Sequence, residues 1–111
     1  MNKLEHSKQS LRSGELKQIT EDILKHMNVK ADVSVVEETV GEETVLNVTI
    51  EGDDLSFLIG YRGESLDGLQ TVLSLILNRK SGMWQRVVTD INGYRKQRQD
   101  IMESKINDKI E

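Results

Sequence analysis

Two glycines bracket a tyrosine and an arginine in the stretch Gly60-Tyr61-Arg62-Gly63, a spacing that could hold the backbone of a nucleic acid. Glycine has no Cβ, so a ligand backbone can approach both ends of such a loop closely. Arg62 adds a guanidinium group that can donate paired hydrogen bonds to phosphate oxygens. A helix predicted to start near Glu64 would direct its unpaired backbone N–H groups to the same place. The loop therefore predicts a site for a phosphate backbone, although a turn without a ligand can use the same residues.

The charge distribution singles out the segment that carries this loop. The chain of 111 residues has a net charge of -4, which argues against a protein that coats nucleic acid through a uniformly basic surface. Residues 58–98 nevertheless hold 7 lysines and arginines against 3 aspartates and glutamates, whereas the segments on either side are acidic. We therefore expect an anionic ligand to be attracted to the loop and to little else on the surface.

Length and composition exclude several other classes of protein. The chain is long enough for one domain, and it has no cysteine, so disulfides and thiolate metal sites are excluded. Its two histidines, His6 and His26, lie far apart and predict no metal site. No nucleophile elbow or catalytic triad is evident, so we expect no enzyme, no catalytic residue and no cofactor. The polar N-terminal segment and the lack of a long apolar run predict a cytoplasmic protein without membrane insertion.

The hydrophobic pattern predicts the elements that must position the loop. Apolar residues at helical spacing predict a first helix from Gly14 to about Met27, with residues 1–13 as a flexible leader. β-branched and alternating residues predict two strands, 33–36 and 46–50, joined by a turn at Gly41. These elements indicate a helix followed by a hairpin.

Two helices are predicted to meet at the glycine loop. The first is short, is capped by Asp53 or Asp54, and ends at Gly60. The elements that follow are a helix over 64–80 with a wide apolar face, a strand over 86–91 and a charged closing helix from Tyr94. Trp84, between the last two helical segments, is predicted to anchor the core rather than to serve as a stacking surface.

This order of elements around a Gly-x-x-Gly loop resembles a type II KH domain, an α+β fold with a three-stranded sheet packed by helices. The resemblance places the KH domain at residues 14–93, with an additional C-terminal helix at 94–111. The stretches 58–70, 78–79, 87–90 and 93–98 look like the KH domain of the bacterial Jag family, whose members are associated with sporulation and with the membrane-insertase locus. In that family the closing helix would link to a second nucleic-acid-binding domain, whose Arg-x-x-x-His signature does not occur in the closing segment.

The resemblance implies binding of single-stranded RNA without catalysis, in post-transcriptional regulation linked to the cell envelope or to sporulation. Tyr61 occupies a position where lysine is common, so its ring would stack on a base or sugar in place of an ion pair. The candidate RNA-binding residues are Ile59, Gly60, Tyr61, Arg62, Gly63, Glu64, Arg79, Lys80 and Arg86. For the last three, a solvated basic edge is an equal alternative.

Two other functions agree with the same sequence. The net charge and Tyr61 in the loop also fit a protein-interaction or dimerisation module with weak nucleic-acid affinity. Its partner would be a second copy of the chain or another KH protein. Binding of single-stranded DNA is a further alternative, because a backbone clamp grips features that both polymers share.

Overall fold

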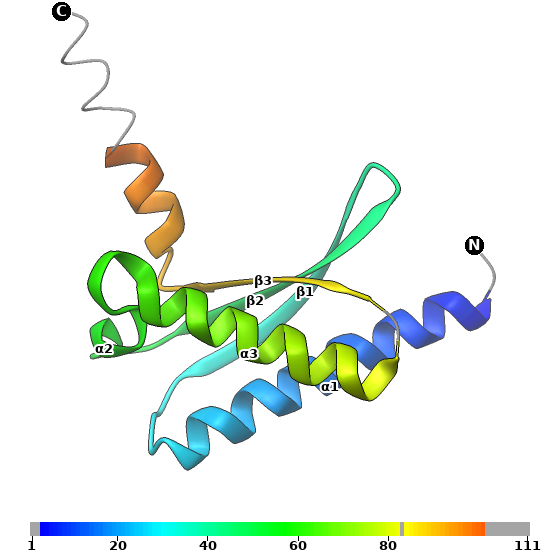
Figure 1. The fold of residues 1–111 in the computed structure, drawn as a ribbon, viewed down its shortest axis with the longest axis horizontal. Helices are drawn as coiled ribbons and strands as arrows, with labels where there is room; N and C mark the ends of the chain where they lie inside the picture. The colour runs from blue at the N-terminus through cyan, green and yellow to red at the C-terminus, as the bar shows by residue number, and fades with distance from the viewer. Residues whose placement is uncertain (1–2, 83, 102–111) are drawn as a thin grey trace, which may run out of the picture.

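The computed structural model describes residues 3–82 and 84–101 and shows a three-stranded sheet with its long helices on one side (Figure 1). The elements in chain order are α1 (Lys3–His26), β1 (Asp32–Val40), β2 (Glu43–Glu51), α2 (Ser56–Ile59), a single 3-10 turn (Tyr61–Gly63), α3 (Glu64–Ser81) and β3 (Arg86–Ile91). Residues 94–101 are again helical. The α+β fold with a three-stranded sheet is therefore confirmed.

The sheet has the strand order β1-β2-β3 and mixes the two kinds of pairing. β1 and β2 are antiparallel and are joined by the tight turn at Gly41, whose φ of 64° suits glycine. β2 and β3 are parallel, because the connection between them crosses the sheet through α2 and α3. This crossover places the glycine loop at one end of the sheet, beside the carboxyl end of β3 (Figure 1).

The core lies between the sheet and the two long helices. α1 packs on β1, α3 packs on β3, and the two helices contact each other. Both long helices and the strands β2 and β3 contribute fully buried apolar side chains: Leu16, Leu46, Val48, Ile50, Leu66, Leu73, Leu77 and Ile91. Burial of each large aliphatic side chain stabilises the fold by about 1.5–3 kcal/mol. The base of the glycine loop is thus fixed on a rigid scaffold.

The first helix begins earlier than the sequence predicts. It starts at Lys3 rather than near Gly14, so residues 3–13, which we expected to form a leader, belong to α1. Lysine, glutamate, glutamine, leucine and arginine are strong helix formers, and this segment has no proline or glycine before Gly14 to end a helix. Ser13, which directly precedes the predicted start, consequently lies within the helix, and its hydroxyl donates a hydrogen bond to Glu37 Oε1 at 2.8 Å.

Two smaller predictions are wrong. Neither Asp53 nor Asp54 caps the short helix, because the residue at its N-terminal boundary is Leu55 and no side chain makes a capping hydrogen bond there. Asp54 instead turns the chain with a φ of 57°. Trp84 does not anchor the core, since it is 76% exposed in the connection between α3 and β3. The core-facing positions are filled by aliphatic residues on either side of it.

Candidate nucleic-acid interface

Gly60 ends α2 and is fitted to its place in two ways. Its backbone N–H donates to the carbonyl of Ser56 at 3.0 Å, which closes the short helix. Its φ of 72° with ψ of -174° lies in a region that is essentially restricted to glycine. A Cβ built there would also lie 2.8 Å from the Cβ of Ser65. Both the backbone conformation and the space therefore require glycine.

Gly63 directly precedes α3 and packs against a tyrosine ring. Its φ of 81° is left-handed, and the position that its Cβ would occupy lies 3.0 Å from Cε1 of Tyr94. The ring belongs to the first turn of the 94–101 helix, and Gly63 itself is buried. The second glycine of the loop is therefore needed because an aromatic side chain packs directly against the backbone.

The two residues between the glycines form a pair. Arg62 has φ of 54° and ψ of 24°, an uncommon conformation for a residue other than glycine, and such a backbone costs about 1–3 kcal/mol. Its guanidinium carbon lies 5.0 Å from the centroid of the Tyr61 ring. A cation over an exposed ring is worth about 0.5–1 kcal/mol. The ring is 71% exposed, so the loop presents a cation and an aromatic surface side by side at its tip.

The start of α3 leaves backbone donors next to the loop. Gly63 occupies the capping position and supplies no side-chain hydrogen bond, and the N–H of Glu64 donates to the carbonyl of Tyr61. The N–H groups that follow in the first turn have no partner of the α-helical kind, and they lie at the positive end of the helix dipole. Two carboxylates in that turn, Glu64 and Asp67, oppose an anion. Asp67 Oδ1, however, is paired with Arg95 Nη1 at 2.9 Å. Among the predicted residues, Glu64 therefore weakens the attraction for phosphate.

A single arginine outside the predicted site ties the loop region to the sheet. Arg95 Nε donates to the carbonyl of Thr89 at 2.7 Å, and Nη2 donates to Gln70 Oε1 at 3.1 Å. Gln70 Oε1 also accepts the Thr89 N–H at 2.8 Å. These side chains satisfy backbone groups on the outer edge of β3, which would otherwise be free to pair with another strand. The charge of Arg95 is thus already used inside the protein.

The turn after β3 is held by two further side chains. The carboxylate of Asp90 accepts the backbone N–H groups of Ile91 at 2.9 Å and Arg95 at 3.1 Å. Asn92 exchanges two hydrogen bonds with the backbone of Gly52, at 2.9 and 3.1 Å. The sequence predicted no contact for Asp90 or Asn92, although Asp90 belongs to the stretch 87–90 that resembles the Jag family. Their effect is to fix the direction of the 94–101 helix next to the loop.

The structure does not bring all of the predicted site residues together. Arg79 and Lys80 lie at the far end of α3, and a rise of 1.5 Å per residue puts Arg79 roughly 24 Å along the helix from Gly63. Lys80 lies 3.8 Å from Glu15, and Arg86 lies 3.7 Å from Glu43, both as exposed ion pairs. Nearer the loop, Ile59 is half-buried against the core. One clamp at the loop therefore cannot include the three distant cations.

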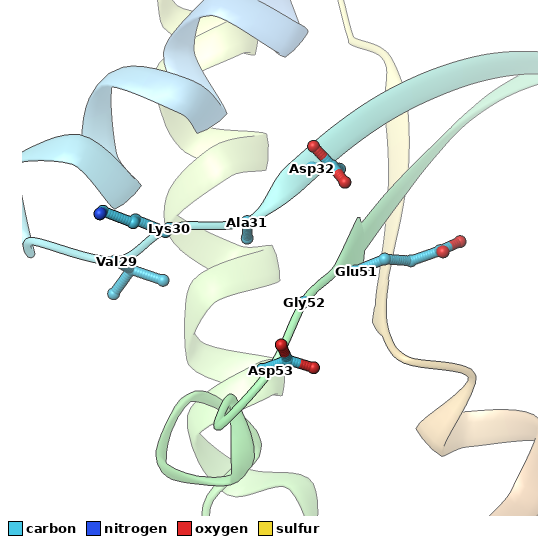
Figure 2. A pocket seen from close by; sticks show the side chains of 7 residues that line it. All are labelled: Val29, Lys30, Ala31, Asp32, Glu51, Gly52 and Asp53. Atoms are coloured by element: carbon cyan, nitrogen blue, oxygen red, sulfur yellow. The ribbon is translucent and has the colours of Figure 1, made fainter.

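Two hollows flank this region and differ in character. One of about 340 Å³ lies between α1, α2 and α3 and is mainly apolar, with exposed Met27, Phe57 and Val72 on its border. The other, at the ends of β1 and β2, is lined by three carboxylates and Lys30, which points away from them in Figure 2. Its negative charge is unsuited to phosphate. The described residues contain no group of three side chains fit to hold a metal ion.

Known proteins are similar to this chain over the segment that contains the sheet, helix α3 and the glycine loop. The family model described as KhpA/KhpB, KH domain, matches residues 16–91. The RNA-binding protein KhpB of Clostridium symbiosum is 39% identical over 84 residues, which cover 76% of this chain and 37% of that protein. The RNA-binding protein KhpB of Bacillus subtilis (strain 168) is 34% identical over 73 residues, which cover 66% of this chain and 33% of that protein. The chain thus matches about a third of the length of these relatives. In the described part of the chain, no helix is long and apolar enough to cross a membrane.

Proposed function

We propose that the chain, which belongs to the KhpA/KhpB KH-domain family, binds single-stranded RNA at the Gly60–Gly63 loop. Its membership of that family confirms the assignment to the Jag family that was predicted from the sequence. The observation that supports this proposal is the geometry of the loop itself. Two glycines that are required by conformation and space flank an exposed arginine, at the uncapped start of a long helix. The two relatives carry the name RNA-binding protein.

In this proposal the loop binds the RNA backbone. Phosphate oxygens accept hydrogen bonds from the first turn of α3 and from Arg62, whose guanidinium carbon lies over the Tyr61 ring. The Tyr61 ring offers its other face to a base or sugar, and such stacking is worth about 1–3 kcal/mol per base. No step of this binding requires a cofactor, a metal ion or catalysis.

The test places negative charge at the loop. We expect the double variant Tyr61→Asp, Arg62→Asp to bind a fluorescently labelled single-stranded RNA at least roughly tenfold more weakly, because charge-assisted hydrogen bonds are each worth about 1.5–3 kcal/mol. Fluorescence anisotropy at fixed salt measures the affinity. The control is Lys17→Asp with Ser34→Asp, which changes the net charge equally at exposed positions on α1 and β1. Equal weakening in both variants, or none at the loop, would refute the proposal.

A matched DNA oligonucleotide separates RNA from DNA. The proposal expects tighter binding of RNA, since only RNA has the 2′-hydroxyl that proteins read. Equal affinity for the two polymers would support the single-stranded DNA alternative. The three distant cations, Arg79, Lys80 and Arg86, are proposed to contact only a strand that extends beyond the loop along α3.

A second candidate function is self-association, which the sequence had left open. The apolar hollow between α1, α2 and α3 favours it, because Met27, Phe57 and Val72 are each about half exposed there. A second copy of the chain would cover this face. Light scattering over a concentration series tests the idea, with Phe57→Ser as the disrupting variant, and a monomer at every concentration would rule it out.

The proposal includes the setting of the interaction. The Jag resemblance suggests post-transcriptional regulation linked to the cell envelope or to sporulation, in the cytoplasm where RNA is present. Another KH protein is the alternative partner to a second copy. Recovery of RNA with the tagged chain from cells, compared with the loop double variant, would identify the transcripts that the loop selects.

A further inference from the structure

Tyr94 lies between the glycine loop and a second arginine. One edge of its ring packs against Gly63, with Cε1 3.0 Å from the position that a Cβ would take and the hydroxyl 3.7 Å from it. The same hydroxyl accepts a hydrogen bond from Arg98 Nη1 at 3.2 Å. Tyr94 and Arg98 are four residues apart on one helix, so their side chains lie on the same face. These successive contacts join the Arg98 guanidinium to the start of α3.

Arg98 differs from Arg95, a cation one turn earlier on the same helix, in the groups that it contacts. Arg95 is held by Asp67, Gln70 and the Thr89 carbonyl, which together engage all three of its guanidinium nitrogens. Arg98 is exposed, and among the side chains that the structure describes, those of residues 12–80, 82 and 84–101, no carboxylate forms an ion pair with it. One guanidinium N–H donates to Tyr94, and with respect to these described side chains other donors of the planar fork are left for a ligand.

We propose that Arg98 is a second phosphate-binding cation of the loop and that Tyr94 is the residue that positions it. The inference rests on the proposed RNA-binding function and deepens it. Arg62 and Arg98 would bind the same strand from the loop tip and from the neighbouring helix. Arg98 lies outside the span of the family match, residues 16–91. The second cation would supply the charge that Tyr61 does not bring to the loop.

The salt dependence of RNA binding tests the role of Arg98. Each phosphate contact with a single strand contributes about 0.7 to the slope of log affinity against log salt concentration. We therefore expect Arg98→Gln to reduce the slope by about 0.7 and to weaken binding roughly three- to tenfold at low salt. Lys96→Gln is the matched control, because it removes the same charge from a position roughly 200° around the helix. It should leave the slope close to that of the parent chain.

The role of Tyr94 is tested by removing only its hydroxyl. Tyr94→Phe keeps the ring against Gly63, so thermal stability should stay unchanged while RNA binding weakens by roughly two- to fivefold. In the double variant with Arg98→Gln, the two effects should not add, because both act through the same guanidinium. Full additivity would show that Tyr94 does not position Arg98.

The outcomes separate this inference from the proposed function. If the parent chain binds RNA but Arg98→Gln and Lys96→Gln give equal slopes, the second cation is wrong and the loop proposal stands. If the parent chain does not bind single-stranded RNA at all, both are wrong. A reduced slope in Arg98→Gln alone supports the two-cation clamp.

Discussion

Gly63→Ala is the substitution whose effect the structure predicts most sharply. The left-handed backbone of Gly63, with φ of 81°, costs a residue with a Cβ about 1–2 kcal/mol. The new methyl group would lie 3.0 Å from Cε1 of Tyr94, so the ring must move, at a further cost of about 0.5–1.5 kcal/mol for a strained side-chain torsion. We therefore expect a loss of about 2–3 kcal/mol, which lowers Tm by roughly 10–20 °C for a domain of this size.

Gly68→Ala provides the control for this prediction. Gly68 lies in the interior of α3, its φ is not in the left-handed region, and nothing lies within 4 Å of an added Cβ. The same substitution should therefore stabilise the protein by about 0.5–1 kcal/mol, because alanine is the better helix former. Circular dichroism during heating measures both variants. If Gly63→Ala is as stable as the parent chain, or if both variants shift Tm in the same direction, the assigned role of the Tyr94 contact is wrong.

Two further predictions concern the packing around β3. The hydroxyl of Thr89 is buried and has no hydrogen-bond partner within residues 3–82 and 84–101, so Thr89→Val should leave stability unchanged or raise it by about 1 kcal/mol. Thr20→Val removes a hydroxyl that donates to the Leu16 carbonyl at 2.8 Å, so it should give no gain in thermal denaturation. Arg95→Lys should destabilise the fold by about 1–3 kcal/mol, because the planar fork that reaches the β3 edge is lost. Asp67→Asn should lower the free energy of unfolding by less than about 1 kcal/mol, since that carboxylate is 65% exposed. Urea denaturation measures both variants, and a larger loss in Asp67→Asn than in Arg95→Lys would contradict this account.

The sequence predicted those features that depend on local pattern. The apolar residues of α3 recur at helical spacing, and Leu66, Leu73 and Leu77 are indeed buried. The alternation in β2 places Leu46, Val48 and Ile50 in the core, as the period of a strand requires. The pattern failed at the N-terminal end of α1, where polar residues with high helix propensity show no clear apolar period.

The distribution of charge in the sequence did not reveal which cations are available to a ligand. Residues 58–98 are basic as a block, yet Arg95 is used to hold the edge of β3. Arg79 lies at the opposite end of α3 from the loop. A count of charges along the chain cannot separate these cases, because ion pairing depends on partners that are distant in sequence.

The amino-acid sequence alone determined the α+β fold, the position of the glycine loop and the family, because hydrophobic period, glycine spacing and short motifs are local properties of a chain. Only the tertiary structure decided why Gly63 must be glycine and which arginine lies beside it. Tyr94 meets Gly63 across 31 positions of sequence, as a result of the parallel pairing of β2 with β3. Such a contact exists only after the crossover has formed, so no local pattern encodes it.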